Sequence, residues 1–259
     1  MGPMTDELDM SGRTVVVTGG ARGIGRGIAT AFLSRGADVV VCGRSAPDEL
    51  PSVDGRTALF IAADVRDADA VQALVTATVD QLGRLDVLVN NAGGSPSADS
   101  ATVSPKFSKA IIELNLLAPL VCAQCANAVM QRQPDGGSII NIASVSGLRP
   151  SPGTAAYGAA KAGVLNLTQT LAVDYAPKVR VNAISAGLIR TEQSHLHYGD
   201  DAGIAAVGAT VPLGRMGAPA DIANACVFLA SPLAAYVSGA NLVVHGGGEA
   251  PAYLDAADA

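Results

Sequence analysis

The chain has 259 residues, of which 49% are hydrophobic and 15% are charged, and its formal net charge is −6. This acidic balance, without a cluster of basic residues, argues against a nucleic-acid surface as the main function. Apolar stretches are interrupted within about a dozen residues, short of the roughly 18 that a bilayer requires, so we expect no membrane-spanning segment. Residues 1–10 are acidic and lack the apolar run of a signal peptide, which favours a flexible arm and a cytoplasmic protein. Residues 249–259 form an acidic, alanine-rich tail that we expect to be mobile.

Short apolar runs alternate with helical patterns along the chain. The expected strands cover residues 14–17, 38–42, 57–62, 85–89, 138–142, 180–184 and 242–244. The expected helices cover residues 24–34, 67–82 with Asp67 as N-cap, 106–132, 155–175 and 219–229. Strands that are apolar throughout are covered on both faces, and alternation of strands with helices is typical of a parallel, doubly wound sheet. We therefore predict a single α/β, Rossmann-like domain over residues 1–259, with about seven strands and helices on both faces.

Residues 187–217 are the exception to this alternation. They are irregular, polar and rich in glycine, as expected for a lid over a site. The lid contains His195 and His197, which could bind a metal, but no third ligand has a suitable context. We expect substrate-pocket or surface roles for these histidines and for their neighbours Glu192 and Tyr198.

Four cysteines are present, and Cys122 and Cys125 form a Cys-x-x-Cys pair that could serve redox or zinc chemistry. No second pair of cysteines and no suitably spaced pair of histidines completes a metal site. The pair also lies in a helical pattern, where small buried thiols are common. We therefore expect core packing for these thiols, a reduced protein and no metal site.

A glycine-rich turn follows the first expected strand. Its sequence is Thr18-Gly19-Gly20-Ala21-Arg22-Gly23-Ile24-Gly25. Parallel sheets bind nucleotides at the carboxyl ends of their strands, where glycines let the backbone approach a pyrophosphate and a helix N-terminus attracts the anion. The spacing is Gly-x-x-x-Gly-x-Gly rather than the commoner Gly-x-Gly-x-x-Gly, and such a turn alone could serve only tight packing.

Two polar turns after later strands strengthen the nucleotide-binding interpretation. Asp64-Val65 follows the third strand, where a carboxylate could meet adenine. Asn90-Asn91-Ala92-Gly93 follows the fourth strand, where a sharp turn would close the cofactor crevice, although an ordinary turn remains the alternative.

The second candidate site is the sequence Tyr157-Gly-Ala-Ala-Lys161, whose two functional side chains project from one helix face. A free phenol has a pKa near 10, and a nearby ammonium favours the phenolate and lowers that pKa. Ser144 ends the fifth strand thirteen residues earlier, so its hydroxyl would lie near the phenol and could bind a carbonyl oxygen. One donor to polarise C=O and one acid to deliver a proton are what hydride transfer to a carbonyl requires. Tyr-x-x-x-Lys alone is common on ordinary helix faces.

At this point the chain resembles the short-chain dehydrogenase/reductase family over nearly its whole length. The residues that carry the resemblance are Thr18 to Gly25, Asp64-Val65, Asn90 to Gly93, Asn115, Ser144, Tyr157, Lys161 and Asn182. The resemblance implies that Tyr157 is the general acid/base, Ser144 orients the substrate oxygen, and Lys161 holds the nicotinamide ribose and lowers the tyrosine pKa. Asn115 would hold a water of a proton relay behind Lys161, with a structural role in helix bending as the alternative.

The resemblance also implies a set of cofactor contacts and an assembly. The expected contacts are Gly19, Arg22, Gly23, Ile24, Gly25, Arg44, Asp64, Val65, Asn91, Ala92, Gly93, Tyr157, Lys161, Gly187, Ile189 and Thr191. The expected helices 106–132 and 155–175 carry small apolar residues on more than one face, so both sides must be covered. The resemblance implies a homotetramer with two-fold axes.

Two departures from the family pattern lie near the cofactor. The family usually has Pro-Gly after the sixth strand, and here Ala186-Gly187 should loosen the turn without removing a catalytic group. The family often has Val-Asp-Gly-Gly near its end, whereas this chain has Val244-His245-Gly246-Gly247. We expect His245 to be structural.

The end of the second strand favours NADP(H) over NAD(H). NAD-specific folds place a carboxylate there to bind the ribose hydroxyls, whereas this chain has Gly43 followed by Arg44. A guanidinium can bind a 2′-phosphate through two hydrogen bonds, and Arg22 can reach the same region.

The sequence therefore predicts an NAD(P)-dependent oxidoreductase that acts between a small-molecule carbonyl and a secondary alcohol, most similar to the ketoacyl reductase branch. Two alternatives remain at this level. One is an epimerase or dehydratase that uses the cofactor transiently. The other is a non-catalytic dinucleotide sensor on the same fold, because a fold does not establish a function.

Overall fold

The computed structural model describes residues 7–249 and contains a seven-stranded sheet in which all neighbouring strands are parallel. The strands are β1 (Thr14–Thr18), β2 (Asp38–Gly43), β5 (Leu59–Ala62), β6 (Val87–Asn90), β7 (Gly137–Ser144), β8 (Val179–Ala186) and β9 (Asn241–Val244). Their order is β5-β2-β1-β6-β7-β8-β9, so the direction of winding reverses between β1 and β6. Open α/β sheets bind ligands at such a reversal, outside the carboxyl ends of the strands.

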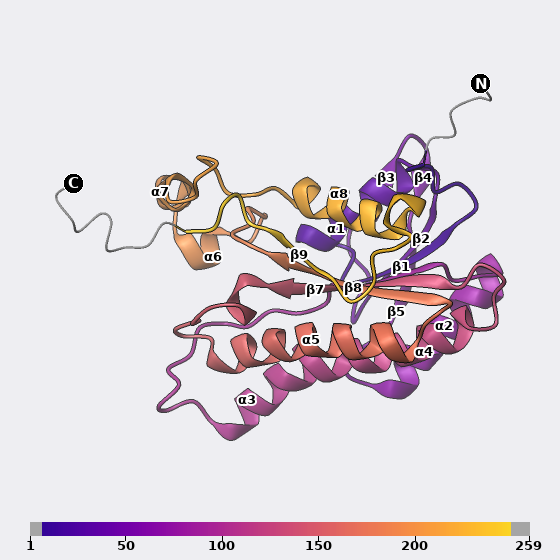
Figure 1. The fold of residues 1–259 in the computed structure, drawn as a ribbon. Coiled ribbons are helices and arrows are strands. Elements are labelled where there is room, and N and C mark those ends of the chain that lie inside the picture. The colour runs from indigo at the N-terminus through magenta and orange to yellow at the C-terminus, as the bar shows by residue number, and fades with distance from the viewer. Residues whose placement is uncertain (1–6, 250–259) are drawn as a thin grey trace.

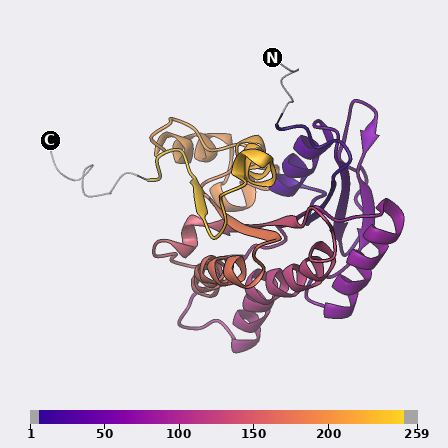
Figure 2. The same cartoon turned by 45° about the vertical axis from the view of Figure 1, so that its right-hand side comes forward.

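The helices form a layer on each face of this sheet (Figure 1). They are α1 (Gly23–Leu33), α2 (Ala68–Leu82), α3 (Pro105–Ile112), α4 (Ala118–Met130), α5 (Ala155–Asp174), α6 (His195–Tyr198), α7 (Asp201–Ala209) and α8 (Pro219–Ala230). Helices α1 and α8 pack together above the sheet, and α2, α4 and α5 lie below it (Figures 1 and 2). The predicted doubly wound α/β fold with about seven parallel strands is confirmed.

Alternation along β1 explains why its sequence is apolar throughout. Val15 and Val17 belong to the core between the sheet and helices α1 and α8. Val16 belongs to the core on the opposite face, between the sheet and helices α2 and α4. Each strand residue therefore loses contact with water on one side of the sheet or the other, which stabilises the fold by roughly 1.5–3 kcal/mol for a large aliphatic side chain. Cys122 lies in the second core with Cys125 against it, so the expected core packing of this pair is confirmed.

One predicted helix boundary is confirmed and one predicted strand boundary is wrong. Asp67 caps α2 as expected, because its carboxylate accepts hydrogen bonds from the backbone of Asp69 and Ala70. The predicted strand at 57–62 is wrong at its start. Thr57 instead belongs to a two-stranded antiparallel hairpin of β3 (Ser52–Val53) and β4 (Arg56–Thr57).

The long helix predicted at 106–132 is interrupted by a π-helical turn, Glu113–Leu117. Asn115 lies in this turn, and its Nδ2 donates to the carbonyl oxygen of Ile111 at 2.9 Å. A side chain that takes a helix carbonyl in this way displaces the regular backbone ladder, and π turns often mark functional positions. Residues Pro105–Met130, with the π turn included, form a helix that is long and apolar enough to cross a membrane, with a mean hydropathy of 1.4. The expectation that no apolar stretch reaches the length of a membrane span is therefore wrong. The buried side chains of this helix pack into the core, and core helices commonly reach this length and hydropathy.

Two short helices correct the expectation of an irregular lid. Helices α6 and α7 lie side by side at the left of Figure 1, beyond one end of the sheet. The base of the lid is held by a bridge in which Arg190 N donates to Gly217 O at 2.8 Å and Gly217 N donates to Leu188 O at 2.9 Å. Both ends of the lid are therefore fixed to each other.

The two chain ends were expected to be a flexible arm and a mobile tail. Residues 1–6 and 250–259 lie outside the described residues. Within the arm, Met10 is buried and its N–H donates to Arg35 O at 2.8 Å, so the arm packs on the fold at that point. The expectation of a flexible arm is wrong for Met10.

Candidate active site

Ser144 and Tyr157 meet at the carboxyl end of β7. Ser144 is the last residue of β7, and Tyr157 lies in the first turn of α5. Their side chains lie close enough to interact, because Ser144 lowers the pKa of Tyr157 against the larger raising effect of burial. Ser144 Oγ also accepts a hydrogen bond from Ser146 N at 3.1 Å, which fixes the hydroxyl at the start of the following 3₁₀ turn. The two groups can therefore face the same substrate oxygen.

Lys161 lies one helical turn after Tyr157 and is buried. Its Nζ donates to Ile142 O at 2.8 Å and lies 5.6 Å from the centroid of the Tyr157 ring. Burial lowers the pKa of Lys161 to about 8. Burial raises the pKa of Tyr157 above its ordinary value, while the side chain of Ser144 acts in the opposite direction. The expected lowering of the Tyr157 pKa by Lys161 is therefore wrong in this structure, because desolvation of the phenolate dominates.

Asn115 and Lys161 flank the same piece of backbone. Asn115 Oδ1 accepts from Gly94 N at 2.8 Å, and its Nδ2 donates to Gly94 O at 3.0 Å. A Cβ atom on Gly93 would lie 2.6 Å from Asn115 Oδ1 and 3.3 Å from Lys161 Nζ, so only glycine fits there. The structure thus brings Asn115, Lys161 and Tyr157 into one cluster with Ser144.

The glycine turn between β1 and α1 has the shape of an anion cradle. Gly19 and Gly23 adopt positive φ angles of 63° and 53°, which other residues rarely adopt. A Cβ atom on Gly25 would lie 2.3 Å from Gly19 O, so this position also requires glycine. The first backbone N–H groups of α1 point out of the turn without helical partners, as an anion site needs. These residues fit the pyrophosphate of a dinucleotide.

Asn91 braces that turn from the neighbouring strand. Its Nδ2 donates to Thr18 O at 2.9 Å and to Gly19 O at 3.2 Å. Thr18 Oγ1 in turn accepts from the backbone N–H groups of Asn91 and Ala92, each at 3.0 Å. The Nδ2 group of Asn91 is thus committed to the turn.

The ribose end of the crevice is lined by charged residues. Arg22 and Arg44 are exposed, and within residues 7–249 neither forms an ion pair. Asp64 is bound by Arg66 through two hydrogen bonds of 3.0 and 2.5 Å, and this contact holds the pKa of Asp64 at about 2. The positive charge of Arg44 lowers the pKa of Asp64 further. Asp64 is therefore already neutralised, whereas the two arginines are available to a phosphate.

The lid begins beside the catalytic candidates, because Ser144 pairs with Ala186, the residue before Gly187. Gly187 N donates to Val244 O at 3.0 Å, and a Cβ atom on Gly187 would lie 2.6 Å from His245 Cβ. The turn after Ala186, which was expected to be looser than in the family, is therefore held to β9 by this hydrogen bond. Farther along the lid, Glu192 Oε1 accepts a hydrogen bond from Gly23 N at 2.9 Å, a contact that the sequence did not indicate.

A cavity of about 290 Å³ opens between the lid and the ends of β7 and β9. Its lining residues are Val145, Leu148, Arg149, Gly187, Leu188, Val211, His245, Gly247, Gly248 and Glu249. The walls are mainly aliphatic, and an ion pair of Arg149 with Glu249 lies at the rim. Burial and the charge of Glu249 raise the pKa of Tyr198 in the lid, and Tyr198 in turn raises the pKa of Tyr157, so the lid is within electrostatic range of both.

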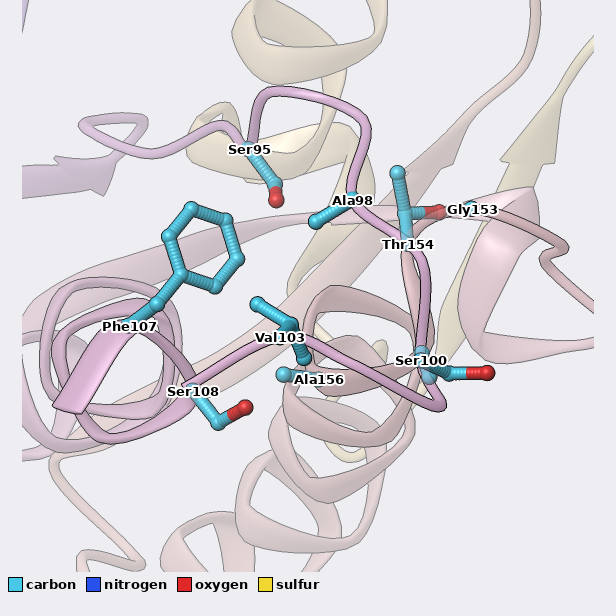
Figure 3. Close-up of a pocket in the computed structure, with 10 residues that line it drawn as sticks. Ser95, Ala98, Ser100, Val103, Phe107, Ser108, Gly153, Thr154 and Ala156 are labelled. Atoms are coloured by element: carbon cyan, nitrogen blue, oxygen red, sulfur yellow. The ribbon is translucent and has the colours of Figure 1, made fainter. Parts of the chain in front are cut away.

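A second cavity of about 90 Å³ lies at the start of α5 (Figure 3). Figure 3 shows the Phe107 ring on one side, with Ser95 and Ala98 from the loop after β6 and Thr154 before α5 on the other. This volume holds only a few water molecules. The larger cavity is therefore the better candidate for a substrate.

The family profile described as enoyl-(acyl carrier protein) reductase matches residues 19–249. The chain belongs to the short-chain dehydrogenase/reductase family. It is 38% identical over 249 residues to 3beta-hydroxysteroid dehydrogenase 1 of Eggerthella lenta, covering 92% of this chain and 94% of that protein. It is 35% identical over 246 residues to 3-oxoacyl-(acyl-carrier-protein) reductase of Synechocystis sp., covering 92% and 97%. The ligand-free structure of aldohexose dehydrogenase from Thermoplasma acidophilum matches with a TM-score of 0.86 and 33% identity, covering 93% of this chain and 95% of that one.

As a short-chain dehydrogenase/reductase, the protein is an oxidoreductase that transfers hydride between a nicotinamide dinucleotide and a hydroxyl or carbonyl group. The predicted family, its ketoacyl-reductase-like character and the reaction class are confirmed. The identities of the catalytic and cofactor-binding residues stay predictions, although the structure gathers the four catalytic candidates in one place. Sequence reasoning missed the cavity rim of Arg149 and Glu249 and the contact of Glu192 with the glycine turn, because neither pairing has a local signal.

Proposed function

We propose that this short-chain dehydrogenase/reductase interconverts a secondary alcohol and a carbonyl in a compact small molecule, prefers NADP(H), and uses Tyr157 as its general acid/base. The observation that carries the proposal is the meeting of the Ser144 and Tyr157 side chains at the carboxyl end of β7, beside the buried Lys161. The pair lies at the edge of the sheet where the braced glycine turn also opens.

The bound dinucleotide supplies or accepts the hydride, and the residues of this chain handle the oxygen and its proton. Ser144 donates a hydrogen bond to the substrate oxygen and orients it. Tyr157 gives its proton to that oxygen in reduction and removes it in oxidation. Because burial raises the pKa of Tyr157, the phenol is protonated at neutral pH, which suits the reductive direction. In oxidation the side chain of Ser144 favours the phenolate, because it lowers the pKa of Tyr157 against the effect of burial.

Asn115 and Lys161 have supporting roles. Lys161 is held by Ile142 O and faces the Tyr157 ring, so its ammonium can bind the nicotinamide ribose and carry a proton onward. Asn115, fixed by Gly94 and placed in a π turn, would hold a water behind Lys161. Gly187, Ile189 and Thr191 would cover the nicotinamide from the start of the lid.

The larger cavity supports a compact substrate. Its volume of about 290 Å³ lies just below the range of about 300–1,000 Å³ that is typical of ligand sites. Aliphatic walls from Val145, Leu148 and Val211 would hold the carbon skeleton, and the charged rim would bind polar substituents. His245 lines this cavity, so it has a place in substrate binding as well as in packing against Gly187.

Assembly as a cytoplasmic homotetramer completes the proposal. Large apolar side chains are exposed on the two helices predicted to form the interfaces and on the C-terminal strand β9, namely Leu117, Val173, Leu242 and Val243. Burial of such a surface against another copy removes apolar area from water, and closed symmetric assemblies are the common outcome.

The test is NADPH oxidation by the purified protein with a panel of ketones, ketoacyl thioesters and aldoses, followed by NADP⁺ reduction with the matching alcohols. Net, carbonyl-dependent turnover supports the dehydrogenase. Substrate conversion without net turnover of cofactor would favour the epimerase or dehydratase. Dinucleotide binding with no conversion of any substrate would favour the sensor.

A further inference from the structure

Glu192 caps a helix that begins 169 residues earlier in the chain. Its Oε1 accepts a hydrogen bond from Gly23 N, the first residue of α1, at 2.9 Å. The N-cap residue Arg22 provides no side-chain hydrogen bond, and the first turn of α1 contains no acidic residue. A carboxylate from the lid therefore takes the place that a local capping residue would have.

The neighbouring residue brings the lid into contact with the same turn. A Cβ atom on Gly23 would lie 3.6 Å from Thr191 Cγ2 and 3.9 Å from Glu192 Oε1, which are ordinary contact distances. The lid thus rests on the glycine turn at Thr191 and Glu192. Glu192 is nevertheless exposed, and within residues 7–249 it has no ion-pair partner.

The N-terminus of α1 can serve only one anion at a time. Its free N–H groups and partial positive charge bind a carboxylate and a pyrophosphate for the same physical reasons. Two anions of like charge in contact repel each other, so a dinucleotide on this turn and the carboxylate of Glu192 at Gly23 N exclude one another.

We propose that Glu192 occupies part of the phosphate site of the nucleotide crevice, and that the dinucleotide must displace it, so that cofactor binding and movement of the lid are one coupled event. The inference rests on the proposed placement of the dinucleotide on the glycine turn. Backbone hydrogen bonds hold Leu188 and Arg190 to Gly217 at the base of the lid. The displacement is therefore confined to the part of the lid that follows Arg190.

The direct test is the affinity of the full-length protein for NADP⁺ by calorimetry, with Glu192→Gln as the variant. Glutamine keeps the shape but removes the charge, and we expect the dissociation constant to fall by about two- to fivefold, the range for one charge at a helix N-terminus. Asp201→Asn is the matched control. It removes another exposed lid carboxylate, which pairs with Arg190 and does not contact the turn, and it should leave the affinity unchanged.

A second ligand separates the phosphate site from a general charge effect. Adenosine 2′-monophosphate carries the ribose phosphate but no pyrophosphate, so Glu192→Gln should bind it as the parent does. Lid movement has its own readout, because the chain contains no tryptophan and Leu196→Trp places a single indole on the exposed face of α6. NADP⁺ should change the fluorescence of this indole, and adenosine 2′-monophosphate should not.

The outcomes distinguish this inference from the proposed function. If Glu192→Gln bound NADP⁺ with the same affinity as the parent or more weakly, the displacement of Glu192 would be wrong. The proposed dehydrogenase function would not be affected. An equal gain for adenosine 2′-monophosphate would also overturn the displacement, because the effect would then be one of net charge. A parent protein that binds neither dinucleotide would overturn both.

Discussion

The end of β2 should decide between the two nicotinamide cofactors, and Gly43→Asp tests this without disturbing the fold. Gly43 is the last residue of β2, and its φ angle is not in the positive range. A Cβ atom there would meet only Ser45 O at 3.8 Å and Phe60 Cε2 at 3.9 Å, both ordinary contacts. The substitution therefore introduces a carboxylate at no steric cost.

The magnitude follows from the charges that meet at this edge. A carboxylate and a 2′-phosphate of charge about −2, with centres roughly 5 Å apart at an effective dielectric constant of about 60, repel by about 2 kcal/mol. That repulsion corresponds to roughly a 40-fold loss for NADPH. NADH, which has a hydroxyl in place of the phosphate, gains a hydrogen bond to the same carboxylate.

The assay compares kcat/KM for NADPH and NADH with one carbonyl substrate. The parent should favour NADPH, and Gly43→Asp should lower the NADPH-to-NADH ratio by at least about 40-fold. Gly43→Asn is the control, because it adds the same shape without the charge and should change the ratio far less. Arg44→Ala should also lower the ratio. A parent that prefers NADH, or an asparagine variant that behaves as aspartate does, would refute the reasoning.

Three further outcomes test the catalytic residues and the assembly. Tyr157→Phe should lower kcat by about 10²–10⁴-fold with NADP⁺ affinity unchanged, and a variant that kept most of its turnover would exclude Tyr157 as the acid/base. Because burial lowers the pKa of Lys161 from 10.5 to about 8, the unfolded chain binds more protons than the folded protein across that window, and stability rises with pH there. Relative to Lys161→Met, the parent should gain at most about 3 kcal/mol of unfolding free energy between about pH 7 and 10.5 in urea titrations, and a constant difference would contradict a desolvated ammonium. Light scattering should give a mass near four times 25.9 kDa, whereas a stable monomer at micromolar concentration would exclude the tetramer.

The sequence predicted the sheet and the catalytic cluster because both depend on local patterns. Strand β1 is apolar on both faces, as the two cores around Val15 and Val16 require. Tyr157 and Lys161 share a helix face by spacing alone, and Ser144 ends a strand that must run to the same edge of the sheet. These inferences need no knowledge of distant contacts.

The remaining features depend on tertiary contacts that no local pattern records. The π turn places Asn115 so that it accepts a hydrogen bond from Gly94, a residue of another loop. The contact of Glu192 with Gly23 joins segments 169 residues apart. The direction of the Tyr157 pKa shift depends on how much protein surrounds the phenol, which residue spacing cannot give.

The closed base of the lid has a consequence for how substrate range can change. Hydrogen bonds join Leu188 and Arg190 to Gly217, so the two ends of the segment 191–216 are held next to each other. Ser144, Tyr157 and Lys161 all lie outside this segment, on β7 and α5. The segment can therefore be exchanged, lengthened or shortened without breaking β7 or α5, and a protein that acquired a different one would present a new wall to its substrate while keeping the elements that carry Ser144, Tyr157 and Lys161.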